Sequence, residues 1–117
     1  MDIETTFKQY ISQIIDALST INPELVIIFG SASTGNLHQD SDIDLLVILD
    51  SEEIPSTYES KMKNKLFVRK TLREIGKKVP IDVLVYTKAE YRIILENKNS
   101  FFREIDSTGK ILYEKAS

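Results

Sequence analysis

Residues 25–49 read LVIIFGSASTGNLHQDSDIDLLVIL, which is two apolar runs joined by a polar segment rich in turn residues. The first run, residues 25–29, has five consecutive apolar side chains and ends at Gly30. The second run, residues 43–49, is apolar except for Asp44. Runs this short and this apolar favour strands that are buried on both faces over helices. We therefore predict two buried strands joined by a polar loop.

Helical patterns flank these two strands. Apolar residues at helical spacing predict an amphipathic helix over residues 5–20, which Asn22-Pro23 stops. A long helix is predicted from Pro55 to about Lys78. Its expected apolar face consists of Tyr58, Met62, Leu66, Leu72, Ile75 and Val79.

The rest of the chain continues the alternation of strands and helices. A third strand is predicted at residues 81–86, and Thr87 with Glu90 predicts a capping box for a helix that ends near Asn97. A short helix at 101–105 and an extended piece at 110–113 follow. The order α-β-(loop)-β-α-β-α indicates an α/β fold whose sheet is covered by helices. No repeat or long linker interrupts the pattern, so we expect residues 1–117 to form one domain.

The composition excludes several kinds of site. The absence of cysteine excludes disulfides, thiolate zinc sites and cysteine nucleophiles. The single histidine, His38, excludes a site with two imidazoles, and we expect it to be a solvated surface residue. No apolar run approaches the roughly 18 residues of a membrane span, and the acidic start is unlike a signal peptide. We therefore expect a cytoplasmic protein that has no contact with membranes.

Charge is unevenly distributed along the chain. Residues 1–58 contain ten acidic side chains and one basic side chain, whereas residues 59–78 contain two acidic and eight basic ones. The acidic part suggests cation binding. We interpret the basic part as a solvated helix face, with an anionic or acidic partner as the alternative.

Three aspartates break the apolar pattern of the strands. Asp42 and Asp44 lie two residues apart at the start of the second strand, so their side chains point to one face while Ile43 points to the other. Asp82 interrupts the third strand in the same way. Taken singly, they have ordinary interpretations as a turn residue, an exposed residue and the partner of a lysine. Together they indicate a site for a hard divalent cation, which removes the repulsion between neighbouring carboxylates.

The polar loop adds a second kind of ligand. Gly30 and Ser31 directly follow the first strand, and a glycine and a hydroxyl residue at that place present main-chain N–H groups to phosphate. The loop lacks the Gly-Lys-Ser/Thr part of a Walker A motif and the spaced glycines of a dinucleotide-binding motif. By itself this signal is weak.

With the aspartates it becomes specific. Gly30-Ser31, ten intervening residues and Asp42-Ile43-Asp44, set within IIFGSASTG and SDIDLLVIL, resemble the DNA polymerase β-like nucleotidyltransferase superfamily. The short chain is similar to its minimal nucleotidyltransferase branch, and Pro80-Ile81-Asp82-Val83 corresponds to the strand of the third carboxylate. The resemblance implies a small mixed sheet covered by helices. One departure is that many members of this branch have arginine in the loop where this chain has Ala32 and Thr34.

The resemblance implies a chemistry and the residues for it. Members transfer a nucleoside monophosphate from a nucleoside triphosphate to a hydroxyl and release pyrophosphate. Asp42 and Asp44 would bridge two Mg²⁺ ions, and Asp82 would hold the ion nearest the acceptor and take the proton of its hydroxyl. Gly30 and Ser31, with Ser41 as a further candidate, would bind the phosphates of ATP.

The resemblance also suggests a partner. The branch is similar to the antitoxins of HEPN–MNT toxin–antitoxin pairs, which adenylylate a tyrosine of the toxin. We therefore expect an enzyme that transfers AMP from ATP to a HEPN-type toxin and binds no nucleic acid directly. Two alternatives stay open. One is a non-catalytic antitoxin that masks its partner, and the other is a small-molecule nucleotidyltransferase, similar to those acting on aminoglycosides, with a site shared in a homo-oligomer.

Overall fold

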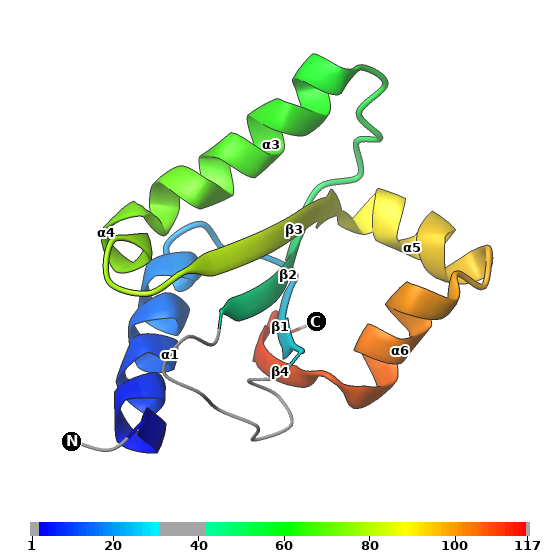
Figure 1. The fold of residues 1–117 in the computed structure, drawn as a ribbon. Helices are drawn as coiled ribbons and strands as arrows, with labels where there is room; N and C mark the ends of the chain where they lie inside the picture. The colour runs from blue at the N-terminus through cyan, green and yellow to red at the C-terminus, as the bar shows by residue number, and fades with distance from the viewer. Residues whose placement is uncertain (1–2, 31–41, 117) are drawn as a thin grey trace.

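The protein has a four-stranded mixed sheet between two groups of helices (Figure 1). The computed structural model describes residues 3–30 and 42–116. In these ranges the elements are α1 (Ile3–Ser19), β1 (Leu25–Phe29), β2 (Ile43–Leu49), α3 (Tyr58–Thr71), α4 (Arg73–Gly76), β3 (Ile81–Thr87), α5 (Lys88–Glu96), α6 (Ser100–Thr108) and β4 (Lys110–Glu114). The predicted α/β class is confirmed, and β1 and β2 have the bounds that the sequence predicts.

The strands are ordered β3-β2-β1-β4. β1 pairs antiparallel with both β2 and β4, whereas β2 and β3 run parallel. The sheet is therefore mixed, and the predicted extended piece at the end of the chain is one of its edge strands. β3 forms the other edge. Parallel neighbours need a crossover connection, and α3 and α4 supply it between β2 and β3.

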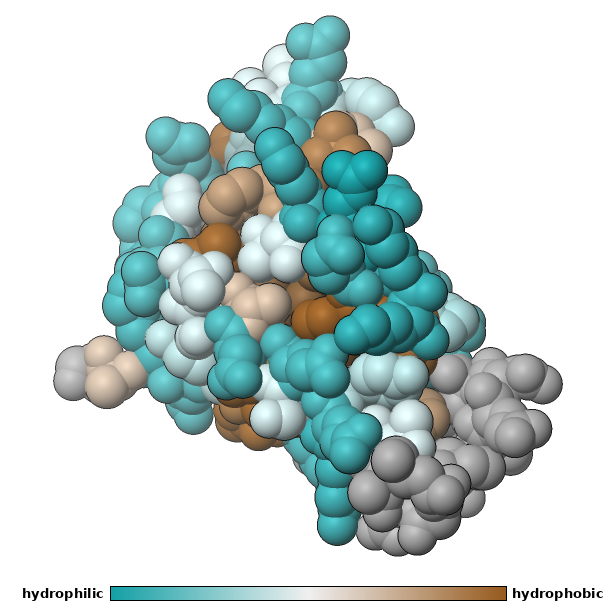
Figure 2. Space-filling model, turned by 90° about the vertical axis from the view of Figure 1, so that its left-hand side faces the viewer, coloured by the Kyte–Doolittle hydropathy of each residue, from teal (hydrophilic) through white to brown (hydrophobic). Residues whose placement is uncertain are grey.

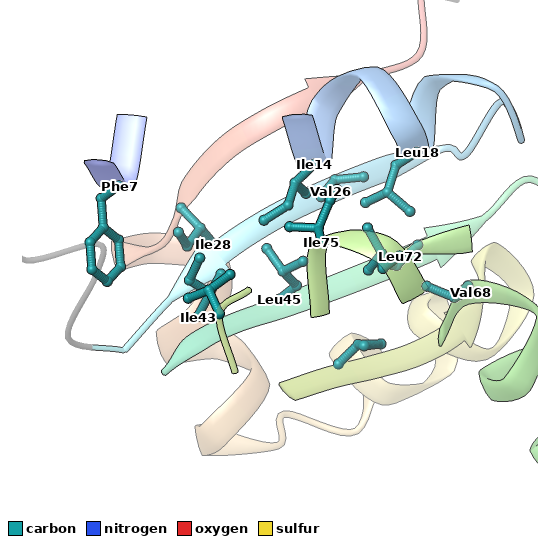
Figure 3. Close-up of a cluster of buried hydrophobic side chains, with 13 residues drawn as sticks. Phe7, Ile14, Leu18, Val26, Ile28, Ile43, Leu45, Val68, Leu72 and Ile75 are labelled. Carbon is teal, nitrogen blue, oxygen red and sulfur yellow. The ribbon is translucent and has the colours of Figure 1, made fainter. Parts of the chain in front are cut away.

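Helices cover both faces of the sheet (Figure 1). Alternate residues of β1 and β2, such as Val26 and Leu45, pack against α1, α3 and α4, and this larger cluster is drawn in Figure 3. The intervening residues, such as Ile27 and Leu46, pack against α5 and α6. Two-sided burial explains why the two central strands read as continuous apolar runs. No helix among the described residues is long and apolar enough to cross a membrane.

The helix boundaries follow local signals. α1 ends before Asn22, which adopts a φ of 49°, a conformation that asparagine tolerates better than most residues. The predicted capping box at the start of α5 is confirmed, because the Thr87 side chain accepts from the main-chain N–H of Glu90 and the Glu90 side chain accepts from that of Thr87. The Asn99 side chain caps α6 in a similar way.

The long helix predicted from Pro55 is wrong in its bounds, and its predicted apolar face is confirmed only in its second half. The helix begins only at Tyr58, where the Thr57 side chain caps it by accepting from the main-chain N–H of Ser60. The hydroxyl of Thr87 donates to the carbonyl of Glu53 at 2.7 Å and ties the preceding segment to the end of β3. The helix is interrupted at Leu72 before the short α4. Of the expected face residues, Leu72, Ile75 and Val79 are buried, whereas Tyr58 and Leu66 are exposed. Within α3, only Val68 is buried.

An ion-pair cluster ties the end of β2 to α5 and β4. Asp50 accepts from Lys88 at 2.6 Å and also from Lys115, and Glu52 pairs with Arg92. The two lysine ammonium groups lower the pKa of the Asp50 carboxyl to about 2. This cluster lies at the opposite end of β2 from Asp42 and Asp44.

We expect the unfolding free energy at acidic pH to depend on the ion pairs of Asp50. Because its pKa is lower in the folded protein than in the unfolded chain, its stabilising contribution is present at neutral pH and is lost as the pH falls toward about 2. The unfolding free energies of the native protein and of Asp50→Asn should therefore converge below pH 4. Urea unfolding measured across this range tests the prediction. A difference that does not change with pH would contradict it.

Candidate active site

Two of the three predicted carboxylates lie directly across from one another on neighbouring strands. Asp44 of β2 is in register with Asp82 of β3. Ile81 and Val83 belong to the cluster packed under α1, α3 and α4, so Asp82, which lies between them, points to the other face. Asp44 points to that same face, because its neighbours Ile43 and Leu45 are buried in the same cluster as Ile81 and Val83. The sheet thus carries both carboxylates on its α5–α6 face.

Asp42 lies two residues before Asp44 and is exposed. The sequence predicts that Asp44 and Ile43 point to opposite faces of the sheet. The structure agrees, because Ile43 is fully buried on the face opposite to Asp44. No lysine or arginine in the described ranges forms an ion pair with Asp42, Asp44 or Asp82. The ordinary interpretation of Asp82, as the partner of a lysine, therefore finds no such lysine among the described residues.

The Asp44 carboxylate is in an unfavourable place for a negative charge. Burial raises its pKa, and the nearby charges of Asp82 and Asp42 raise it further. Each of these effects penalises the charged form, and each is relieved by a bound cation. The donors are hard carboxylate oxygens, which suit Mg²⁺. Among residues 3–30 and 42–116, however, no three acidic, histidine or cysteine side chains are grouped closely enough to count as a formed metal site.

Gly30 makes room for this carboxylate. It has a φ of 75° directly after β1, and a Cβ atom built on it would lie 2.4 Å from Oδ2 of Asp44. Any other residue would therefore have to move the carboxylate as well as adopt a left-handed backbone conformation. The sequence predicts that Gly30 contacts phosphate. Its positive φ and its closeness to Asp44 are further reasons why this position requires glycine. Ser31 and Ser41, the other predicted phosphate ligands, and Ala32, Thr34 and His38 lie outside the described residues.

Gly30→Ala is expected to lower the unfolding free energy by about 1–3 kcal/mol, because alanine is strained at positive φ and its methyl group meets Asp44. The matched control is Gly76→Ala, since a Cβ there meets nothing within 4 Å. Alanine in that helical position should leave stability unchanged or raise it by up to about 1 kcal/mol. Urea unfolding of both variants measures the difference. Equal effects would show that the space beside Gly30 is not restricted.

Asp44→Asn is expected to leave the metal-free protein as stable as the native protein, or more stable. The raised pKa means that the folded state binds a proton on Asp44 more tightly than the unfolded chain does. Native stability should therefore gain from protonation as the pH falls through that pKa, whereas the neutral asparagine removes the penalty at every pH. Urea unfolding in EDTA tests this. If Asp44→Asn is unfolded in EDTA, Asp44 is needed for the fold and the prediction is wrong.

An aromatic surface next to the carboxylates was missed from the sequence. Phe29 of β1 is in register with Asp44, and its ring meets that of Phe101 of α6 edge to face at 6.2 Å. Phe101 also contacts Phe102 and is 47% exposed. The only sequence signal was the pair of phenylalanines in a predicted short helix. That signal does not reveal which strand the helix covers.

Comparisons with known proteins agree with this arrangement. The family described as polymerase beta, nucleotidyltransferase matches residues 12–117. The chain belongs to this nucleotidyltransferase family. No curated protein matches the chain in sequence.

Two solved structures have a similar fold. The first is described as a toxin-antitoxin with AMP-PNP, with a TM-score of 0.51 and 20% identity over 90% of this chain and 73% of that chain. The second, a mutant of the toxin-antitoxin MntA-HpeT, has a TM-score of 0.48 and 18% identity over the same shares of the two chains. At this identity the first match supports the fold alone, and the nucleotidyltransferase family rests on the family match.

Proposed function

We propose that this chain transfers AMP from ATP to a hydroxyl group of a partner protein, and that it acts as the antitoxin of a HEPN-type toxin. The observation that carries the proposal is the register of Asp44 with Asp82 on one face of the sheet, beside Asp42 and the end of β1. The family is one of nucleotidyltransferases. The protein of similar fold is described as a toxin-antitoxin with AMP-PNP, an analogue of ATP, and we carry both features to this chain as proposals.

The three aspartates have separate roles in this proposal. Asp42 and Asp44 would together hold two Mg²⁺ ions, and Asp82 would hold one of these ions and face the acceptor hydroxyl. When bound, the ions supply positive charge that stabilises the attacking and leaving oxygens of the displacement. Gly30, with Ser31 and Ser41, binds the phosphates of ATP through main-chain N–H and hydroxyl groups.

The transfer itself is an in-line displacement at the α-phosphorus of ATP. The acceptor oxygen, which we propose belongs to a tyrosine, forms the new bond to phosphorus while the bond to the pyrophosphate oxygen breaks. Asp82 takes the proton of the hydroxyl. The half-exposed ring of Phe101 packs on Phe29, which is in register with Asp44, and offers an apolar surface to an aromatic acceptor or to the base of ATP.

The test is to mix the chain with Mg-ATP and the protein encoded beside it, and to weigh the intact partner by mass spectrometry. We expect whole AMP increments on the partner, which vanish with Asp42→Ala. Tryptic mapping identifies the modified side chain. A partner that is bound and inhibited without any gain in mass would contradict the transfer and favour an antitoxin that acts by masking.

A further inference from the structure

A groove runs along the free edge of the sheet, between β3 and the helices α3 and α4. One cavity in it, of about 540 Å³, is lined by the α3–α4 residues Leu66, Arg69, Lys70 and Arg73 and by Ile81 and Val83 of β3, among others. A second cavity, of about 160 Å³, continues along β3 from Val83 to Tyr86 and is lined on the other side by α3. The two cavities share Val83, so together they follow most of the strand.

The main chain on this side of β3 has no partner strand. β3 pairs with β2 alone in the described sheet. The carbonyl of Pro80 accepts from the N–H of Ile43 in β2, at 2.9 Å. Because main-chain groups alternate in direction along a strand, those of Asp82 and Leu84 also face β2, whereas those of Ile81, Val83 and Val85 point away from β2 at the open edge of the sheet. This edge therefore offers donors and acceptors to an added strand.

The opposite wall of the groove is basic. Arg69, Lys70 and Arg73 line the larger cavity, and none of them forms an ion pair with an acidic side chain in the described ranges. Lys77 also lines it and pairs with Glu74 at 3.2 Å. The stretch 59–78 contains eight basic and two acidic residues. An anionic occupant is therefore favoured over a neutral one.

The same wall also exposes apolar surface. Leu66 of α3, which lines the larger cavity, is 54% exposed. In the space-filling view, hydrophobic residues lie among hydrophilic ones at the top of the molecule, where Figure 1 places α3 (Figure 2). With Ile81 and Val83 on the strand side, the groove combines apolar contacts, cationic side chains and a free main-chain edge. The free strand edge is the feature that an added peptide strand uses, so an extended acidic peptide fits all three features together.

We propose that this groove docks an extended segment of the partner protein as an added strand beside β3, with acidic and apolar side chains both on the face of that strand turned toward α3 and α4. Its acidic side chains meet Arg69, Lys70 and Arg73, and its apolar side chains pack on Leu66, Ile81 and Val83. The identity of the partner as the protein that receives AMP rests on the proposed function above. The groove itself is an additional surface, because its lining residues do not include Asp42, Asp44 or Asp82.

A displayed library of random peptides with the 7-residue length of β3 tests the chemistry of the occupant. Selection on the native chain should enrich sequences that combine Asp or Glu with Val, Ile or Leu at every second residue, because these side chains share one face of a strand. Their binding should fall about 10-fold or more in the double variant Arg69→Glu, Arg73→Glu, whose two sites are exposed. The matched control is Arg103→Glu with Lys110→Glu, two exposed basic residues outside the groove. The control should bind like the native chain.

Main-chain methylation tests the added strand. The tightest peptide is synthesised with N-methyl groups at odd or at even residues, and its affinity is measured by calorimetry. Only one of the two sets donates to β3, so one methylated peptide should lose binding and the other should keep it. Equal affinity of the two methylated peptides, or no enrichment of acidic sequences, would overturn the proposal. A third outcome would also overturn the proposal. In it, no acidic peptide is selected, and a single-stranded uridine oligomer binds the native chain but not the double variant.

The failures of the two proposals are distinguishable. One outcome is that the double variant transfers AMP to the partner and binds the partner as tightly as the native chain does. In that case the groove is not the docking site, and the proposed activity stands. If the acidic peptides bind as expected but no partner gains AMP, the groove binds such a segment and the proposed activity is wrong. Thermal unfolding followed by circular dichroism checks that each variant is folded.

Discussion

Asp44→Asn is expected to lower the rate of AMP transfer by at least about 100-fold while the metal-free protein stays folded. Replacing groups that merely orient a metal ligand typically costs about 10–100-fold, so replacing a proposed ligand should cost more. Asparagine keeps the shape of the side chain but removes the negative charge that a divalent cation needs. The measurement is the rate of AMP incorporation into the partner under saturating Mg-ATP.

A matched aspartate separates this effect from a general loss of charge. Asp16 is exposed on α1, which packs on the face of the sheet opposite to Asp44, so Asp16→Asn should leave the rate unchanged. Asp82→Asn should lose activity as Asp44→Asn does, because the two carboxylates are in register. Activity that survives in both site variants would place the chemistry elsewhere.

Mg-ATP is expected to stabilise the native protein by about 2.7 kcal/mol at 100 times its dissociation constant. For a domain of this size the midpoint of thermal unfolding should rise by roughly 10 °C. In the proposed site, metal and nucleotide would bind only the folded arrangement of Asp42, Asp44 and Asp82. The cation would offset the burial and the repulsion by Asp82 and Asp42 that raise the pKa of Asp44.

The same experiment has two controls. ATP with EDTA should shift the midpoint far less than Mg-ATP does, and Asp44→Asn should show no shift that depends on the metal. A native protein that responds equally to ATP with Mg²⁺ and with EDTA would show that binding of the nucleotide does not use these carboxylates.

The sequence was sufficient to predict β1, β2 and the capped start of α5. Each of these has a sharp local signal: an apolar run that ends at Gly30, a run that begins after Asp42, and the Thr87–Glu90 pair. The strand order could not be predicted from the sequence, because the pairing of β1 with both β2 and β4 depends on contacts between distant segments. The parallel pairing of β2 with β3, which brings Asp82 to Asp44, belongs to the same class of contact.

The errors concern places where tertiary contacts override the local pattern. Residues 58–66 have apolar side chains near one helical face, yet α3 leaves Tyr58 and Leu66 exposed, because the sheet is contacted by Val68 and the residues after it. The close approach of Gly30 to Asp44 is a contact between two strands that sequence spacing cannot reveal. The same holds for the packing of Phe101 on Phe29.

The most direct test of the central claim is the binding of Mn²⁺, which has the same preference for carboxylate oxygen as Mg²⁺, followed by electron paramagnetic resonance. In the presence of a non-hydrolysable ATP analogue, the native protein should remove free Mn²⁺ from solution beyond what the analogue binds alone. Asp44→Asn should remove no more than the analogue does, whereas Asp16→Asn should behave like the native protein. Equal uptake of Mn²⁺ by the native protein and Asp44→Asn would contradict a metal site built on these aspartates.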